Sequence, residues 1–242
     1  MKKITYLIGL AYIFNVSSIF AQNEGVITYE ITINNHRTLP ADQQDMKAMV
    51  PQYRTFKQQL FFNDTESLYK LLMEDDDEDE QQGGGRRFRN RMANTTHYFN
   101  QSTNIFLSQM EMMGKKYIIS DTLKTSPWKF GTETKVIQGY TCMQAYYTST
   151  GERKQIITAW FTNKLRPMLG PEKYNSLPGT ILAIDINNGE RVIVAKKIEL
   201  RPLKKNELSA PTDGEKISQA EFTKKGEEMR KRFSNGGMRF RN

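Results

Sequence analysis

The feature that most constrains the fold is a series of short segments in which apolar and polar residues alternate. In the first segment, residues 26–33, every second side chain is apolar, at Ile27, Tyr29, Ile31 and Ile33. A period of two over this length is typical of a strand with one face buried and the other in water. Similar short runs follow at residues 59–63, 67–73, 95–99, 103–110, 115–120, 140–147, 155–162, 180–186 and 191–200.

Turn-forming sequences separate these runs. They include Asn163-Lys164, Pro178-Gly179 and Asn187-Asn188-Gly189-Glu190. Hairpin-length connections, with no long helices between the strands, favour antiparallel pairing. The sequence therefore predicts a mainly β fold: a single antiparallel curved sheet or open barrel of about ten short strands. We predict one domain, and two small domains are the alternative.

Two stretches interrupt the strand pattern with helical spacing. Residues 41–57 carry apolar side chains three and four positions apart, although Pro51 should kink or break a helix there. Near the end of the chain, Ser218 and Glu221 have the spacing of a capping box, and we expect the helix that follows to run to about Phe233. A minor N-terminal helical segment and a C-terminal helix are thus predicted.

The first residues predict export. Lys2 and Lys3 precede a mostly apolar stretch that ends at Phe20, and Ala21 is a small residue suited to cleavage. This arrangement is typical of a secretory signal peptide over residues 1–21, and an uncleaved anchor helix is the alternative. No later segment approaches the ~20 apolar residues that a membrane-spanning helix needs, so no transmembrane span is predicted.

Composition shifts divide the rest of the chain. We predict a β-rich domain over residues 22–203 and a C-terminal helix with a basic tail over 204–242. Seven consecutive acids at 74–80, three glycines and an arginine-rich run predict an exposed, disordered loop at 74–92. A divalent-cation site is the alternative for the acids, although their spacing is not that of an EF-hand. The basic tail is predicted to be a disordered, solubilising segment, and the alternative is contact with an anionic envelope surface or with the chain's own acidic run. Export argues against nucleic acid as a partner.

Catalytic signatures are missing from the sequence. No Gly-x-Ser-x-Gly, His-Glu-x-x-His, Walker or dinucleotide-binding motif occurs, and His36 and His97 are the only histidines. Cys142, the only cysteine, cannot form an internal disulfide, and it is either buried or available to a partner. A thiol nucleophile paired with His97 is the remaining catalytic option. We therefore predict that the protein is not an enzyme, and no cofactor is predicted.

Methionines offer one metal hypothesis. Soft thioether and thiolate ligands favour Cu(I). The candidate ligands are Cys142, Met110, Met112 and Met113. The alternative is that these side chains fill an irregular core, which is a common use of methionine.

Three blocks in the second half of the chain carry a family resemblance. They are QGYTCMQA at 138–145, AWFT at 159–162 and GPEKYNSLPGTIL at 170–182. In order and spacing they resemble the GLPGLI family of exported Bacteroidetes proteins, over about residues 128–200. Ser176 stands where the family has its first glycine and Thr180 where it has its second leucine. The resemblance implies the periplasm or outer envelope of a Gram-negative bacterium, and the family has no established biochemical activity to transfer.

The motif itself predicts a rigid connection. Leu177, Pro178 and Gly179 follow Gly170 and Pro171, so two proline bends bracket the residues between them. We expect Gly179 to supply a positive φ in a tight turn before the next strand. The alternative is a ligand-contacting loop at the mouth of the curved sheet, beside an apolar pocket. The candidate pocket residues are Trp128, Tyr140, Tyr146, Trp160 and Phe161, which otherwise belong to the core.

These observations favour an exported envelope protein without enzymatic activity. We predict that it binds an envelope protein partner or a small ligand, on the concave face of the sheet or through its edges. A periplasmic copper-binding protein that uses Cys142 and the methionines is the second hypothesis, and a hydrolase without a recognisable motif is the third.

Overall fold

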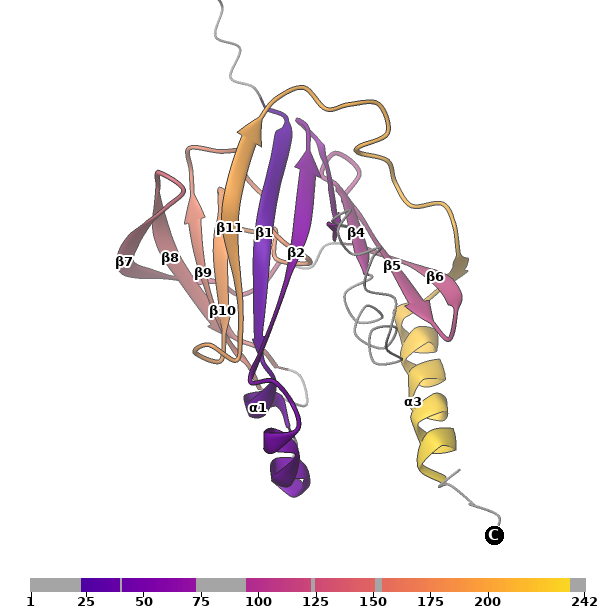
Figure 1. Ribbon diagram of the computed structural model, residues 1–242. Coiled ribbons are helices and arrows are strands. Elements are labelled where there is room, and N and C mark those ends of the chain that lie inside the picture. The colour runs from indigo at the N-terminus through magenta and orange to yellow at the C-terminus, as the bar shows by residue number, and fades with distance from the viewer. Residues whose placement is uncertain (1–22, 40, 73–94, 123–124, 151–153, 236–242) are drawn as a thin grey trace, which may run out of the picture.

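A single twelve-stranded sheet dominates the computed structural model of the chain (Figure 1). The structure describes residues 23–39, 41–72, 95–122, 125–150 and 154–235. The strand order is β12-β6-β5-β4-β3-β2-β1-β11-β10-β9-β8-β7, so the sheet is open, with β12 and β7 at its two edges. The predicted mainly β fold, with an open curved sheet and a C-terminal helix, is confirmed, and the sheet has twelve strands where about ten were expected.

Two antiparallel meanders meet at the centre of the sheet. One runs outward from β1 through β2 to β6. Its strands are β1 (Gly25–Asn34), β2 (Tyr53–Phe62), β3 (Glu66–Leu71), β4 (Thr96–Asn100), β5 (Ile105–Met112) and β6 (Lys115–Thr122). The other starts at the far edge and returns to pair β11 with β1. Its strands are β7 (Lys129–Ile137), β8 (Tyr140–Thr148), β9 (Ile156–Thr162), β10 (Thr180–Ile186) and β11 (Arg191–Leu200).

The predicted helix over residues 41–57 is correct only in its first half. A short helix α1 (Asn35–Thr38) and a 3-10 helix η1 (Ala41–Ala48) follow β1. Pro51 comes next, and from Tyr53 the chain is strand β2, which pairs with β1 along its whole length. The apolar spacing at Tyr53 and Phe56 resembles one turn of a helix, but pairing with the neighbouring strand decides the outcome.

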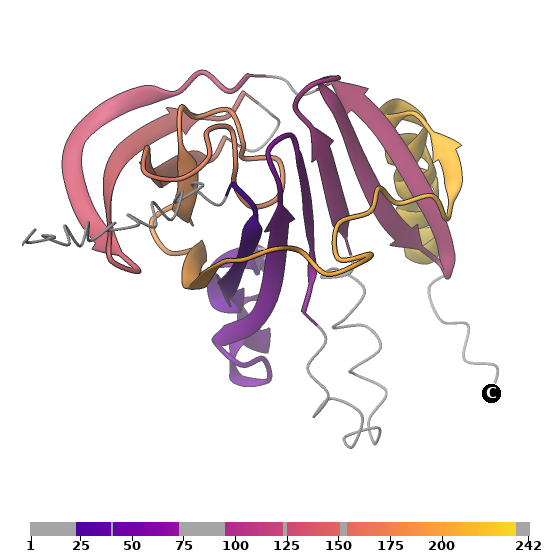
Figure 2. The same cartoon turned by 90° about the horizontal axis from the view of Figure 1, so that it is seen from above.

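The concave face of the sheet holds the main core. Ile27, Tyr29 and Ile31 of β1 are fully buried there, as their period of two predicts. Figure 2 looks down on the curved sheet. The segment 163–179 between β9 and β10 contributes Leu169, Tyr174 and Leu177 to the same core, so it covers part of this face.

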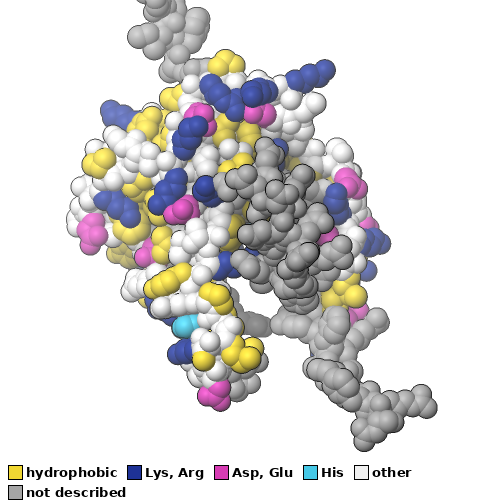
Figure 3. All heavy atoms as spheres, viewed as in Figure 1, with side chains coloured by type: hydrophobic (Ala, Val, Ile, Leu, Met, Phe, Trp, Pro, Cys, Tyr) yellow, Lys and Arg dark blue, Asp and Glu magenta, His cyan; other side chains and the backbone are white. Residues whose placement is uncertain are grey.

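The opposite, outward face carries a smaller core and a mixed surface. Val26, Phe61, Leu68 and Tyr98 form a buried cluster against Leu203 and Leu208 of the segment after β11. Elsewhere on this face charges of both signs lie beside hydrophobic side chains (Figure 3). One such pair is Lys196 Nζ and Glu30 Oε1, 2.9 Å apart.

The end of the chain is attached to the sheet. Strand β12 (Glu215–Ile217) pairs in parallel with β6, and helix α3 (Gln219–Asn235) follows it. The capping box is present, since the Ser218 amide donates to Glu221 Oε2 (3.0 Å) and the Glu221 amide donates to Ser218 Oγ (3.2 Å). Phe222 packs edge-on against Tyr117 of β6. None of the helices that the structure describes has the length and hydropathy needed to cross a membrane.

Three predictions lie outside the described residues. The signal peptide at 1–21 and the whole loop at 74–92 fall in stretches that the structure does not describe, and so do residues 236–242 of the basic tail.

Candidate functional site

A cavity of about 540 Å³ opens on the concave face beside α1. Strands from both meanders and the segment 163–179 line it. Charged and polar lining residues are Asn35, Thr38, Arg54, Gln58, Thr95, His97, Gln155, Glu172, Lys173, Tyr174, Glu190 and Arg191, and apolar ones are Ile33, Phe56, Met110 and Ile186. A hollow on a curved sheet with a mixed lining is the kind of site in which small ligands bind.

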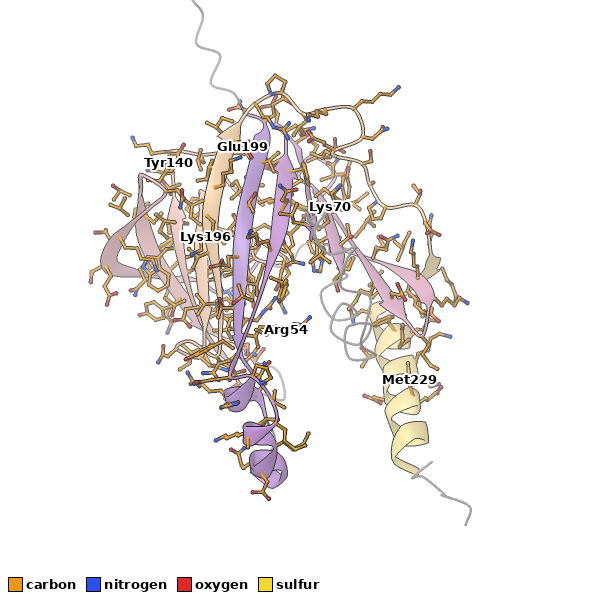
Figure 4. All side chains as sticks on the ribbon, in the orientation of Figure 1. Arg54, Lys70, Tyr140, Lys196, Glu199 and Met229 are labelled. Carbon is orange, nitrogen blue, oxygen red and sulfur yellow. The ribbon has the colours of Figure 1, made fainter. Side chains whose placement is uncertain are left out.

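Strand register places two arginines in this cavity. Ile33 of β1 is paired with Arg54 of β2 on one side and with Arg191 of β11 on the other. Because neighbouring strands lie about 4.8 Å apart, the two arginine Cα atoms are about 10 Å apart on the same face. Figure 4 shows Arg54 at the end of β2 nearest α1. Its guanidinium carbon is 5.5 Å from the centre of the Phe56 ring.

The second arginine is held by Glu172. Nη1 of Arg191 donates to Glu172 Oε2 (3.0 Å) and Nη2 donates to the other oxygen, so the pair is bidentate. The side chains are only 27% and 17% exposed. Burial lowers the pKa of Arg191, but the Glu172 carboxylate outweighs that effect, and the net shift is upward. The pair therefore stays ionised at the wall of the cavity.

His97 lies in the cavity as a neutral imidazole. Its Nδ1 is 3.0 Å from Ser108 Oγ of the next strand, and its ring stacks on Phe106 with ring centres 5.5 Å apart. Burial lowers the pKa of His97 to about 4; the Glu172 carboxylate opposes this shift, and Lys173 and Arg191 add to it. At neutral pH this ring offers hydrogen bonds without a charge.

Two tyrosines in or near the cavity have raised pKa values. Burial raises the pKa of Tyr174, which lines the cavity, and Glu172 adds to that shift. Tyr69 of β3 lies opposite His97 in the β3–β4 register. Its hydroxyl is buried and has no hydrogen-bond partner among the described residues, and burial followed by Glu172 raises its pKa. Both phenols thus remain protonated donors.

The Gly-Pro and Leu-Pro-Gly residues of the motif build the segment that carries Glu172 and Lys173. The Tyr174 amide donates to the Pro171 carbonyl (3.1 Å), and the side chain of Leu177 is 1% exposed. A Cβ on Gly170 would lie 1.9 Å from the Tyr174 carbonyl oxygen, and one on Gly179 would lie 2.2 Å from the Thr162 carbonyl oxygen.

Gly179 therefore serves a different purpose from the one expected. It does not have a positive φ. It is required because the backbone of β9 passes too close for any side chain. Pro178 is exposed at the rim of a second hollow, beside β7.

Of the five aromatic residues of the predicted pocket, only Phe161 lines either of these two hollows. Trp160 and Phe161 are neighbours on β9 and point to opposite faces. Trp160 lies beneath Lys135 Nζ, 3.2 Å from its ring centre. Phe161 is buried at 1% exposure. Trp128 packs on Tyr147, Tyr140 is partly buried against the core, and Tyr146 is 41% exposed.

The candidate copper ligands are also separated. Cys142 is fully buried on β8, whereas Met110 and Met112 are on β5 and Met113 is in the turn that follows. Seven strands lie between β5 and β8 in the sheet. Burial raises the pKa of the Cys142 thiol to about 11. Among the residues that the structure describes, no three His, Cys, Asp or Glu side chains are grouped to hold a metal ion.

The sequence carries a signal for the cavity that the alternation of apolar residues alone does not identify. Arg54 is in phase with Phe56 and Leu60, and Arg191 is in phase with Ile193 and Ala195. His97 is likewise in phase with Phe99. A charged or polar residue on the buried face of a strand is the informative exception to the alternation.

Comparison with known proteins places the fold but not the family. No protein-family model matches the chain, and no curated protein matches it in sequence. Among solved structures, the chain is similar to PNGF-II in two crystal forms. For the C2 form the TM-score is 0.56 at 16% identity over 83% of this chain, and for the P21 form it is 0.55 at 15% identity over 84%. The chain spans about a third of the length of PNGF-II, 32% and 33% in the two forms, and this likeness concerns the fold alone.

Proposed function

We propose that this chain is an exported envelope protein that binds a small ligand in the concave-face cavity and has no catalytic activity of its own. The observation that carries the proposal is the lining of the cavity. Polar side chains from β2, β4, β11 and the segment 163–179 converge there on a hollow that also has an apolar wall. Such a mixture gives a ligand both contact area and orientation.

The resemblance to the GLPGLI family supports the proposed export and envelope setting. The apolar segment before Ala21 supports it independently. The likeness to one third of PNGF-II fits a fold that also occurs within a longer chain, and it concerns the fold alone. The copper hypothesis is not carried forward, because the structure does not bring Cys142 and the methionines together.

Native mass spectrometry of the protein purified gently from its own host tests the proposal. We expect a reproducible excess over the denatured mass from one bound molecule. A Thr95→Trp variant, which fills the cavity from its β4 side, should lose that excess. The matched control is Thr134→Trp, which adds the same volume in the second hollow beside β7 and should keep it.

A bound molecule that survives in Thr95→Trp and disappears in Thr134→Trp would move the site to the second hollow. Absence of any bound molecule in the unaltered chain, together with no binding from a metabolite library, would contradict a ligand-binding function.

A further inference from the structure

The charges around the cavity are unequal. Its described lining contains three cations, Arg54, Lys173 and Arg191, and two carboxylates, Glu172 and Glu190. Glu172 is neutralised by Arg191, which it binds on both oxygens, and Glu190 Oε2 accepts from the Asn187 side-chain amide (3.0 Å). Apart from the Arg191–Glu172 pair, the lining therefore has two cations and one carboxylate.

Lys173 provides the positive charge at the rim. It is exposed, and its Nζ lies 6.0 Å from the centre of the Tyr174 ring. No carboxylate within ion-pair distance of Lys173 is seen in the described part of the chain. A flexible lysine next to a fixed arginine–glutamate pair can move to meet an incoming anion.

The remaining polar groups of the lining are uncharged. Tyr174 stays protonated because burial raises its pKa, and His97 is neutral at pH 7, so each offers a hydrogen-bond donor. Apolar side chains lie beside the cations: Ile33 is paired with both arginines in the sheet, and Phe56 lies beneath the Arg54 guanidinium. Cations and donors next to apolar side chains suit a ligand that has an acidic group at one end and a hydrocarbon or aromatic body at the other.

We propose that the ligand of this cavity is an organic anion: a single carboxylate-type group on an apolar body, with the acidic group against Lys173 and the Arg54 side of the cavity. The proposal rests on the function proposed above and adds the chemical class of the ligand. The apolar body lies over Phe56, Ile33 and Ile186.

Calorimetric titration of the full chain with two probes of the same shape tests this. The probes are 4-phenylbutyrate and its neutral amide, 4-phenylbutanamide, at pH 7 in low salt. We expect the carboxylate to bind at least tenfold more tightly than the amide, and its affinity to fall as salt is raised. Lys173→Gln should weaken carboxylate binding about fivefold, because one charge at ~4 Å in a solvated site contributes about 1 kcal/mol.

The matched control is Lys196→Gln. Lys196 has the same charge but lies on β11 facing outward, where it pairs with Glu30 (Figure 4). We expect this variant to bind the carboxylate as the unaltered chain does. Thr95→Trp should abolish binding of both probes.

Two results would overturn the ligand class. Equal binding of the amide and the carboxylate, lost in Thr95→Trp, would leave the cavity as a binding site while refuting its preference for anions. Binding of neither probe would refute the class as well, and the bound molecule sought by native mass spectrometry would then decide independently whether the cavity is a binding site.

Discussion

Two tyrosines in the core provide a paired test of the packing described above. Tyr29 and Tyr69 are both fully buried and lie in edge-on contact, with ring centres 6.0 Å apart. The Tyr29 hydroxyl donates to the Ile181 carbonyl (2.6 Å), whereas the Tyr69 hydroxyl has no partner among the described residues. The perturbation is Tyr→Phe at each position, which removes one oxygen and keeps the ring.

The two substitutions should change the free energy of unfolding by different amounts or in opposite directions. Tyr29→Phe removes a buried hydrogen bond and leaves the Ile181 carbonyl without that donor, which costs about 1 to 2 kcal/mol. Tyr69→Phe removes a hydroxyl whose cost of burial is not offset by a hydrogen bond within the described residues. Its effect should therefore lie between no change and a stabilisation of about 1 kcal/mol.

Urea unfolding followed by tryptophan fluorescence measures both free energies. With a denaturant slope of ~2.5 kcal/mol/M, a loss of 1.5 kcal/mol lowers the midpoint by about 0.6 M. We expect that decrease for Tyr29→Phe and an unchanged or higher midpoint for Tyr69→Phe, with equal slopes. A loss for Tyr69→Phe as large as that for Tyr29→Phe would refute the assignment of the unpaired hydroxyl.

Four further predictions concern single residues. Gly179→Ala should lower the melting temperature by several degrees, because the Thr162 carbonyl lies 2.2 Å from the added Cβ, whereas Gly114→Ala, with nothing within 4 Å of its Cβ, should lose only the smaller cost of its positive φ. Ser218→Ala should cost the helix about 1 kcal/mol, seen as faster amide exchange in α3 alone. Cys142 should resist a thiol reagent at pH 8 until urea unfolds the chain, since its thiol is buried and its pKa is raised to about 11, and rapid labelling of the folded protein would contradict its burial. Folding lowers the pKa of His97 from 6.5 to about 4, so the contribution of His97 to the free energy of unfolding should be fully present above pH 6.5 and be lost as the pH falls from 6.5 to 4. A His97→Gln variant that shows the same loss over this range would show that another group is responsible.

The central strands were predictable because each is a short, largely apolar run bounded by turn-forming residues, and β10 is buried on both faces. Residues 26–33, 180–186 and 191–200 correspond closely to β1, β10 and β11. Within β11 the fully buried side chains are Ile193 and Ala195, whereas Ile198, further along the strand, is the residue paired with the buried Ile27. The register shift at Thr28/Tyr29 changes the phase of the pairing, which a periodicity count does not detect.

The missed strands are the two at the edges of the sheet. Nearly every side chain of β7 is exposed, and a bulge interrupts its pairing between Phe130 and Thr134. β12 has three residues. Neither strand has a buried face long enough to impose a period of two, so the pattern that identified the others is absent.

The cavity could not be assembled from the sequence for a different reason. Arg54, His97, Glu172 and Arg191 are far apart in the chain, and only the pairing of the strands from β11 through β1, β2 and β3 to β4 and the folding of the segment 163–179 over the sheet bring them together. The Gly-Pro and Leu-Pro-Gly motif pointed to the segment that covers the cavity, but the motif residues themselves shape its backbone and do not line the cavity. Its functional contribution is that it carries Glu172 and Lys173 between Gly170 and Gly179.

A crystal structure of the protein purified from its own host would show whether the concave-face cavity binds a small ligand. We expect ordered density for one small molecule in this cavity, with an acidic group near Lys173 and an apolar part over Phe56. Density for a bound molecule elsewhere, with only solvent between Arg54 and Arg191, would contradict that expectation.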